Sequence, residues 1–199
     1  MLSLYHGKRK LNTHPELFRF VILIPHRDTV KIFEEYRTGL FTKGLLGACS
    51  FPAAAPLAET REHFSRGELT ELARNIRGLT KETDGKITSS AGVFIQSCRN
   101  FSFFGPKLNL PAGEAIFPGS AARKIISPLL PPIFCAAITE EGINYSAENL
   151  PKEAPSLSFR PAFLANLSIR PLKEGAQPYS FEWRIGRPVW LPKYKIILK

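Results

Sequence analysis

The sequence predicts an α+β fold with mixed element order and adjacent, hairpin-like strands. Short apolar segments, rich in the aromatic and β-branched residues that strands favour, recur from residue 18 to the end of the chain. Two other segments, at residues 28–37 and 66–79, instead repeat apolar residues at helical spacing. Several strand-like segments then follow one another directly. That order favours an α+β arrangement over a doubly wound parallel sheet.

The first strand and the first helix are predicted on either side of Pro25. Residues 18–24 form an apolar run that this proline ends, as expected for a buried strand. Asp28 is expected to cap a helix that continues to Arg37. The apolar face of this helix comprises Val30, Ile32, Phe33 and Tyr36. A second short strand is predicted at residues 45–49.

The second helix carries the clearest start signal in the chain. Ser65 and Glu68 have the spacing of a capping box, in which each side chain bonds a free N–H group of the first turn. Gly78 stands where a C-terminal cap is expected. The apolar positions of this helix are Leu69, Leu72, Ala73, Ile76 and Leu79. The pattern predicts an amphipathic helix that packs against a sheet.

The rest of the chain is predicted to be mostly strands. One short helix is expected from Gly119 to Ile126, and residues 139–155 are expected to form a long polar connection. Pro192 interrupts the last strand and so places it at a sheet edge or a bulge. The predicted strands cover residues 93–95, 101–104, 107–110, 133–138, 159–169, 179–185 and 189–198.

Positive charge gathers at both ends of the sequence, which carries a formal net charge of +10. Residues 1–50 hold eight Lys and Arg against four acidic residues, and residues 151–199 hold nine against three, whereas the middle hundred are balanced. Such an excess indicates an anionic partner, such as a phosphate ester, a nucleotide or RNA. Residues 1–17 are expected to lie loosely on the surface, outside a single domain at 18–199.

The cysteines and the hydropathy pattern predict a cytoplasmic protein with no metal, no cofactor and no membrane span. Cys49, Cys98 and Cys135 are odd in number and lack the close spacing of zinc ligands. We expect buried free thiols in a reducing compartment. No apolar run approaches the ~20 residues that a membrane-spanning helix needs, and no signal peptide is recognisable.

Two proline-led segments, residues 50–58 and 159–169, share a design. Each places an aromatic residue and a proline before small and apolar residues, as in an extended chain entering a buried sheet. Neither segment contains a side chain that could act as a general base at neutral pH. The layout is typical of a paired site, but the chemistry of such a site is missing.

With these segments and this order of elements, the chain resembles the 2H (two-histidine) phosphoesterase superfamily, the 2′-5′ RNA ligase-like proteins, over roughly residues 18–198. The resemblance implies a two-lobed fold, with mixed and antiparallel sheets around a central cleft and helices on the outside. It also implies two His-x-Thr/Ser motifs on strands that face the cleft. In that family one histidine removes a proton, the other donates one, and the hydroxyl residues hold the phosphate.

The chain departs from the family at both motifs. Residues 54–57 fall at the first motif, with Ala54 for the histidine and Pro56 for the hydroxyl residue. At the second motif, Asn166 replaces the histidine and Ser168 is retained. A different register places residues 162–165 there and retains neither residue. Because alanine and asparagine cannot titrate, the resemblance implies a degenerate, non-catalytic protein that binds a phosphate ester or RNA, or acts as a scaffold.

Six residues are therefore candidates for the cleft. Asn166, Ser168 and Arg170 would share one face of a strand, because side chains two positions apart point the same way. The remaining three candidates are Arg160, Ser50 and Ala54. The alternative is an active phosphodiesterase with relocated catalytic residues, in which His26 or His63 acts with Ser50 or Ser168. A third interpretation is an unrelated α+β domain.

Overall fold

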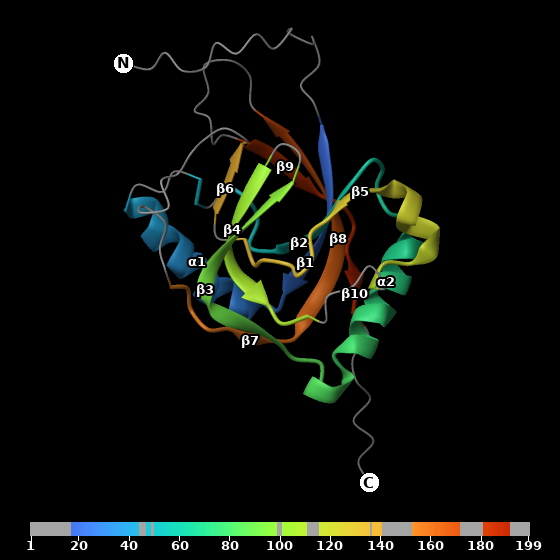
Figure 1. Ribbon diagram of the computed structural model, residues 1–199, viewed down its shortest axis with the longest axis horizontal. Coiled ribbons are helices and arrows are strands. Elements are labelled where there is room, and N and C mark those ends of the chain that lie inside the picture. The colour runs from blue at the N-terminus through green and yellow to red at the C-terminus, as the bar shows by residue number, and fades with distance from the viewer. Residues whose placement is uncertain are drawn as a thin grey trace, which may run out of the picture.

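The computed structural model describes residues 17–43, 47–48, 50–98, 101–110, 116–135, 137–140, 153–171 and 181–191. It confirms an α+β fold with antiparallel sheets (Figure 1). In chain order the elements are β1 (Phe18–Pro25), α1 (Arg27–Thr42), β2 (Ala55–Thr60), α2 (Arg66–Leu79), the 3-10 helix η1 (Lys81–Thr83), β3 (Ile87–Cys98), β4 (Phe101–Leu108), the 3-10 helix η3 (Gly119–Lys124), β5 (Ile125–Pro128), β6 (Ala137–Glu140), β7 (Ser158–Phe159), β8 (Pro161–Pro171), β9 (Phe181–Ile185) and β10 (Val189–Trp190).

The larger sheet has β1 near its centre. Its strand order is β10-β8-β1-β2-β5, and β9 also pairs with β8. Strand β8 is long enough to serve two partners on one side, because β10 pairs with its first half and β9 with its second half. All pairings in this sheet are antiparallel. The two proline-led segments of the sequence thus supply β2 and β8, which flank β1.

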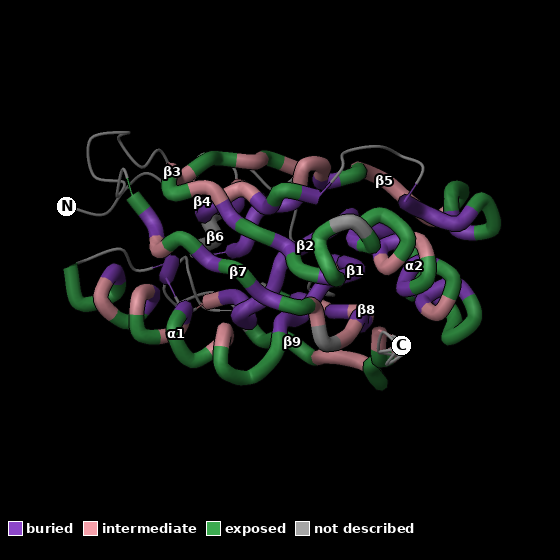
Figure 2. The backbone as a smooth tube through the Cα atoms, turned by 90° about the horizontal axis from the view of Figure 1, so that it is seen from below, coloured by how far each residue is buried: buried purple, intermediate pink, exposed green. Residues whose placement is uncertain are grey.

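The smaller sheet, with the order β6-β4-β3-β7, packs through β4 against one face of the larger sheet. A layer of aromatic side chains, the aromatic layer, lies between the two sheets. The ring centroids of Phe18 and Phe101 lie 4.7 Å apart, and those of Phe20 and Phe103 lie 5.6 Å apart. Figure 2 shows the buried residues concentrated in the strands of the interior, with the exposed ones on the outer turns of the helices. Residues 20–24 of β1 form a continuous apolar run because both faces of the sheet are covered there.

Helix α2 packs against the other face of the larger sheet, over β8 and β10. Its capping box is confirmed: Glu68 N donates to Ser65 Oγ over 3.2 Å, and Ser65 N donates to Glu68 Oε2 over 2.6 Å. The apolar stripe is buried except at its end, where Leu79 is exposed. The C-cap is Thr80 rather than Gly78, since the helix continues through the glycine.

Helix α1 differs from its prediction at both ends and on its buried face. The N-cap is His26, so Asp28 lies in the first turn instead, and the helix continues past Arg37 to Thr42. Ile32 is exposed, whereas Arg37 is buried on the helix face that meets the chain before β2. Arg37 donates to the carbonyl oxygen of Phe51 there, which compensates for burying its charge.

The second half of the chain contains two further corrections. The helix expected at residues 119–126 is a 3-10 helix that ends at Lys124, and β5 follows it directly. Strand β6 (Ala137–Glu140) also includes Thr139 and Glu140, which were expected to begin the polar connection. The predictions for residues 1–16, 44–46, 49, 141–152, 179–180 and 192–199 lie outside the described residues.

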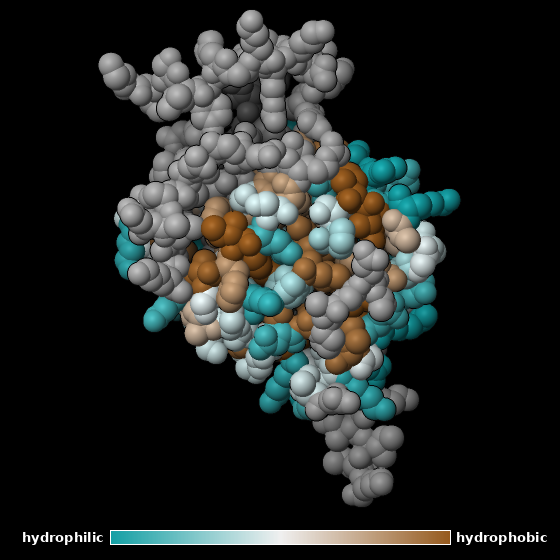
Figure 3. Space-filling view, in the orientation of Figure 1, coloured by the Kyte–Doolittle hydropathy of each residue, from teal (hydrophilic) through white to brown (hydrophobic). Residues whose placement is uncertain are grey.

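Hydrophilic and apolar residues are distributed unevenly over the surface of the molecule. In the orientation of Figure 1, hydrophilic residues cover the side that carries α2, while apolar residues reach the surface over the smaller sheet (Figure 3). On β3, Phe94 and Ile95 are both exposed. No helix in the described part of the chain is long and apolar enough to cross a membrane.

Candidate functional site

Strand β8 presents the predicted row of polar side chains on one face. Its alternate residues Ala165, Leu167 and Ile169 are buried in the aromatic layer between the sheets. The residues between them point to the opposite face, where Asn166 and Ser168 are half-buried and Arg170 is exposed. The predicted alternation of this strand is therefore confirmed.

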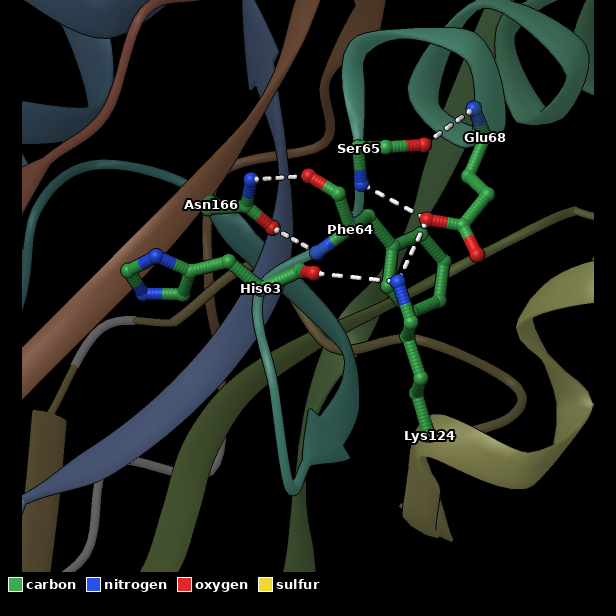
Figure 4. Close-up of polar contacts among 6 residues, drawn as sticks. All are labelled: His63, Phe64, Ser65, Glu68, Lys124 and Asn166. Carbon is green, nitrogen blue, oxygen red and sulfur yellow. Dashed lines mark hydrogen bonds and ion pairs between the residues drawn. The ribbon is translucent and has the colours of Figure 1, made fainter.

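Asn166 holds the loop that joins β2 to α2. Its Nδ2 donates to the carbonyl oxygen of Phe64 over 2.8 Å, and the Phe64 backbone N–H donates to its Oδ1 over 2.9 Å (Figure 4). The side-chain amide is thus engaged, as donor and as acceptor, by one residue of the loop. We therefore assign Asn166 a positioning role rather than the ligand-binding role that the sequence suggests.

The same loop is fixed from two other elements. Arg19 Nη1 on β1 donates to the carbonyl oxygen of Arg61 over 3.2 Å, and the Arg61 N–H donates to the carbonyl oxygen of Lys124 over 2.7 Å. Lys124 Nζ also lies 3.4 Å from the carbonyl oxygen of His63. Phe64 is buried beneath the loop. These contacts fix the backbone on both sides of His63.

The loop brings His63 to Ser168, although 105 positions separate them in the sequence. His63 Nε2 lies 2.9 Å from Ser168 Oγ, and Figure 4 shows the imidazole pointing away from Lys124. Partial burial, together with the positive charge of Arg19, lowers the pKa of His63 below its ordinary value. The imidazole is therefore neutral at pH 7.

Arginines flank Ser168 on the two neighbouring strands. The register places Arg19 of β1 opposite Ser168 on one side, and Arg184 of β9 opposite it on the other. Directly opposed residues of neighbouring strands point to the same face of a sheet. Arg170, two positions along β8, stands opposite Glu182, which partly offsets its charge. We call Arg19, His63, Ser168, Arg170 and Arg184 the Ser168 centre.

A partly buried ion pair supports the centre from the helix side. Lys124 Nζ lies 2.8 Å from Glu68 Oε2, the oxygen that also accepts from Ser65 N. Burial alone would raise the pKa of Glu68, but hydrogen bonds from Lys124 and Ser65 outweigh it and lower the pKa. The capping carboxylate is therefore ionised at neutral pH, and it ties η3 to the start of α2.

The remaining candidates lie elsewhere. Arg160 forms an ion pair with Asp84, and it precedes Ser168 by eight residues, which corresponds to ~26 Å along an extended chain. Ser50 lies in the turn before β2, where its N–H donates to the carbonyl oxygen of Gly47 over 3.4 Å. His26 is exposed beside Asp28, 3.3 Å from its carboxylate.

Ala54 needs a correction, because its side chain cannot line a cleft. It is fully buried in the aromatic layer between the sheets, and its carbonyl oxygen accepts a bond from the Cys135 N–H over 3.0 Å. The small side chain fits a position that is closely covered by neighbouring strands and by Phe51. The first proline-led segment is therefore core, and the second alone contributes to the site.

Two arginines of the centre are absent from the candidates that the sequence supplies. Arg19 does carry a signal, since it is the one charged residue within the apolar run at 18–24. A charge inside a strand indicates that this end of one face is not covered by core. Arg184 carries a weaker signal, because its segment alternates polar and apolar residues and only the strand register reveals its partner.

Within the described residues, no group of three or more His, Cys, Asp or Glu side chains could hold a metal ion. Comparison with family models, with curated proteins and with solved structures finds no match to this chain. The chemistry of the Ser168 centre thus has to be argued from its own residues.

Proposed function

We propose that this protein is a degenerate, non-catalytic relative of the 2H phosphoesterases that binds a phosphate ester or RNA at the Ser168 centre. The observation that carries the proposal is the placement of Ser168 between Arg19 and Arg184 on three neighbouring strands. A hydroxyl between two guanidinium groups suits a phosphate, because guanidinium binds phosphate oxygens through paired charge-assisted hydrogen bonds.

The surroundings of the centre favour an anion over a neutral ligand. Arg170 and Arg184 are exposed and Arg19 is half-buried, so their charges reach solvent at one place on the sheet. Glu68 is engaged by Lys124 and does not offset these charges. Clustered cations attract anions over roughly 8 Å at physiological ionic strength, and added salt weakens that attraction.

The two-histidine mechanism of the family lacks its groups at both motif positions. The side chain of Ala54 is a buried methyl group, and the amide of Asn166 does not titrate and is bonded to Phe64. In the other register, Ala162 and Leu164 stand for the histidine and the hydroxyl residue. Binding through charge and hydrogen bonds needs no proton transfer, so it survives these replacements.

A second candidate function is hydrolysis by relocated residues, with Ser168 as the nucleophile. The 2.9 Å contact between His63 Nε2 and Ser168 Oγ favours it, because a neutral imidazole at that distance can accept a serine proton. Turnover of a phosphodiester that both His63→Ala and Ser168→Ala abolish would support hydrolysis over binding alone.

Binding of a short single-stranded RNA at low and at high salt tests the main proposal. Wild-type protein is expected to bind at low salt and to lose affinity as salt increases. Ser168→Ala and Arg184→Ala should weaken binding severalfold, whereas Arg160→Ala should not, since Arg160 lies before the start of β8, eight residues from Ser168. Equal affinity in all four proteins would place any binding elsewhere.

A further inference from the structure

The hydrogen bond between His63 and Ser168 decides what the centre can offer a ligand. If Ser168 donates to a neutral His63, its only hydroxyl hydrogen is consumed. If His63 Nε2–H donates to Ser168 Oγ over the observed 2.9 Å, the hydroxyl hydrogen is available to an anion. A protonated His63 permits only the second arrangement. Its protonation would therefore make the hydroxyl hydrogen of Ser168 available to the ligand.

We infer that the Ser168 centre takes the terminal phosphate of a phosphomonoester, and that His63 gains a proton when the phosphate binds. This inference rests on the proposed function and specifies its ligand. A terminal phosphate carries up to two charges and three terminal oxygens, whereas an internal phosphodiester carries one charge and two. The residues around Ser168 suit a terminal phosphate better than an internal phosphodiester.

The donors stand side by side across the sheet instead of following one another along a strand. Arg19, Ser168 and Arg184 come from three adjacent strands, which lie ~4.8 Å apart, and the loop adds His63 beside Ser168. Arg170, the next cation along β8, already has Glu182 opposite it. A single doubly charged group would therefore meet several donors at once, which a singly charged backbone phosphate would use less fully.

The charges around His63 explain why the proton arrives with the ligand. Arg19 faces it from β1 and Arg184 lies on the same sheet face in β9, whereas Lys124, which approaches its backbone from η3, is paired with Glu68. Its own loop adds Arg61 and Glu62, which offset one another. This positive surplus disfavours the imidazolium in the free protein. A bound phosphate dianion offsets this surplus and so favours the imidazolium.

The centre is also rigid enough to select a geometry. Asn166 bonds both backbone groups of Phe64, and Arg19 holds the carbonyl oxygen of Arg61. The backbone on either side of His63 is thus fixed before any ligand arrives. A preorganised site loses less entropy on binding than a loop that must become ordered.

Titration with uridine 5′-monophosphate and with uridine, from pH 5 to pH 8.5, tests the inference. The monophosphate should bind at least about tenfold more tightly than uridine near pH 6. Affinity should fall below pH ~6, where the phosphate loses its second charge, and fall again at higher pH as the proton on His63 is lost. In His63→Gln the fall at higher pH should disappear, because glutamine donates a hydrogen bond without titrating. The His63 ring resonance, assigned by that variant, should titrate at a higher pH when the monophosphate is present.

A hexauridylate with a 5′-phosphate, compared with one that ends in a 5′-hydroxyl, separates this inference from the proposed function. Tighter binding of the phosphorylated oligonucleotide supports the inference. Equal, salt-sensitive binding of both would leave the proposed function standing and overturn the inference, whereas no binding of either would overturn both. Transfer of the 5′-phosphate to Ser168 Oγ, with release of the oligonucleotide that ends in a 5′-hydroxyl, would also overturn the inference, since the serine would then act as a nucleophile.

Discussion

Asn166 bonds both backbone groups of Phe64 across 102 positions of the sequence, through contacts of 2.8 and 2.9 Å. This pair of hydrogen bonds joins β8 to the loop between β2 and α2. Under the proposed function, Asn166 stands at the second motif position, where a 2H phosphoesterase would carry a histidine. By holding Phe64, Asn166 places the neighbouring His63 next to Ser168.

Removal of the two hydrogen bonds between Asn166 and Phe64 should lower the free energy of unfolding. Asn166→Ala deletes two partly buried hydrogen bonds and leaves the Phe64 backbone groups unsatisfied, so we expect a loss of about 1–3 kcal/mol in urea unfolding. Asn166→Asp should cost at least as much, because an oxygen would replace the donor that faces the carbonyl oxygen of Phe64. Asn109→Ala is a matched control, since Asn109 makes an exposed side-chain contact with Thr88. If Asn166→Ala were as stable as the control, the two hydrogen bonds between Asn166 and Phe64 would contribute nothing to stability.

The capping box of α2 should contribute independently. Ser65→Ala removes the acceptor for the Glu68 N–H and should lower the free energy of unfolding by about 0.5–2 kcal/mol. Ser120→Ala, at an exposed position of η3, should change it by less than about 0.5 kcal/mol. Thermal or urea melts of the three proteins measure the difference. Identical melts for wild type and Ser65→Ala would contradict the assignment.

The ion pair of Glu68 and Lys124 makes stability depend on pH. The pKa of Glu68 is lower in the folded than in the unfolded protein, so the folded state binds this proton less readily. Its stabilisation is complete above the unfolded value of about 4.3 and is lost as pH falls through the folded value. Wild type should lose more stability between pH 6 and pH 3 than Glu68→Gln does. If the free energies of unfolding of wild type and Glu68→Gln, measured in urea, changed equally with pH, this prediction would be contradicted.

Purified protein should not hydrolyse the substrates of the resembled family. The general acid and the general base are each worth about 10²–10⁴-fold in rate, and neither motif supplies one. Hydrolysis of 2′,3′-cyclic nucleotides and of 2′-5′ linkages should therefore not exceed that in a buffer blank. Turnover that His63→Ala abolishes but His26→Ala preserves would instead establish Ser168 and His63 as relocated catalytic residues.

Local patterns predicted the helices and strands better than they predicted the site. The capping box of α2 and the alternation along β8 depend on residues close in sequence, and both are confirmed. By contrast, the burial of Arg37 and the exposure of Ile32 depend on which side of α1 the core covers. Helical spacing alone does not reveal that side.

The site itself depends on strand register and on a loop. Arg19 and Arg184 flank Ser168 only because β1 and β9 pair with β8 in this register. His63 reaches Ser168 only because Asn166 and Arg19 fix its loop. The choice of Ala54 as a cleft residue was wrong for a similar reason. A proline-led segment has the same local sequence whether its strand is covered on both faces or lines a cleft.

The most direct test of an anion site at the Ser168 centre is charge reversal at Arg184, which stands opposite Ser168 on β9, compared with charge reversal at Arg160, which lies just before β8. Binding of a 5′-phosphorylated hexauridylate should be measured by fluorescence anisotropy for wild type, Arg184→Glu and Arg160→Glu across a range of salt concentrations. We predict that Arg184→Glu weakens binding at low salt by at least about tenfold and makes the salt dependence shallower, while Arg160→Glu resembles wild type. Equal losses in the two variants would indicate attraction by overall charge alone, and a larger loss in Arg160→Glu would contradict the placement of the site at Ser168.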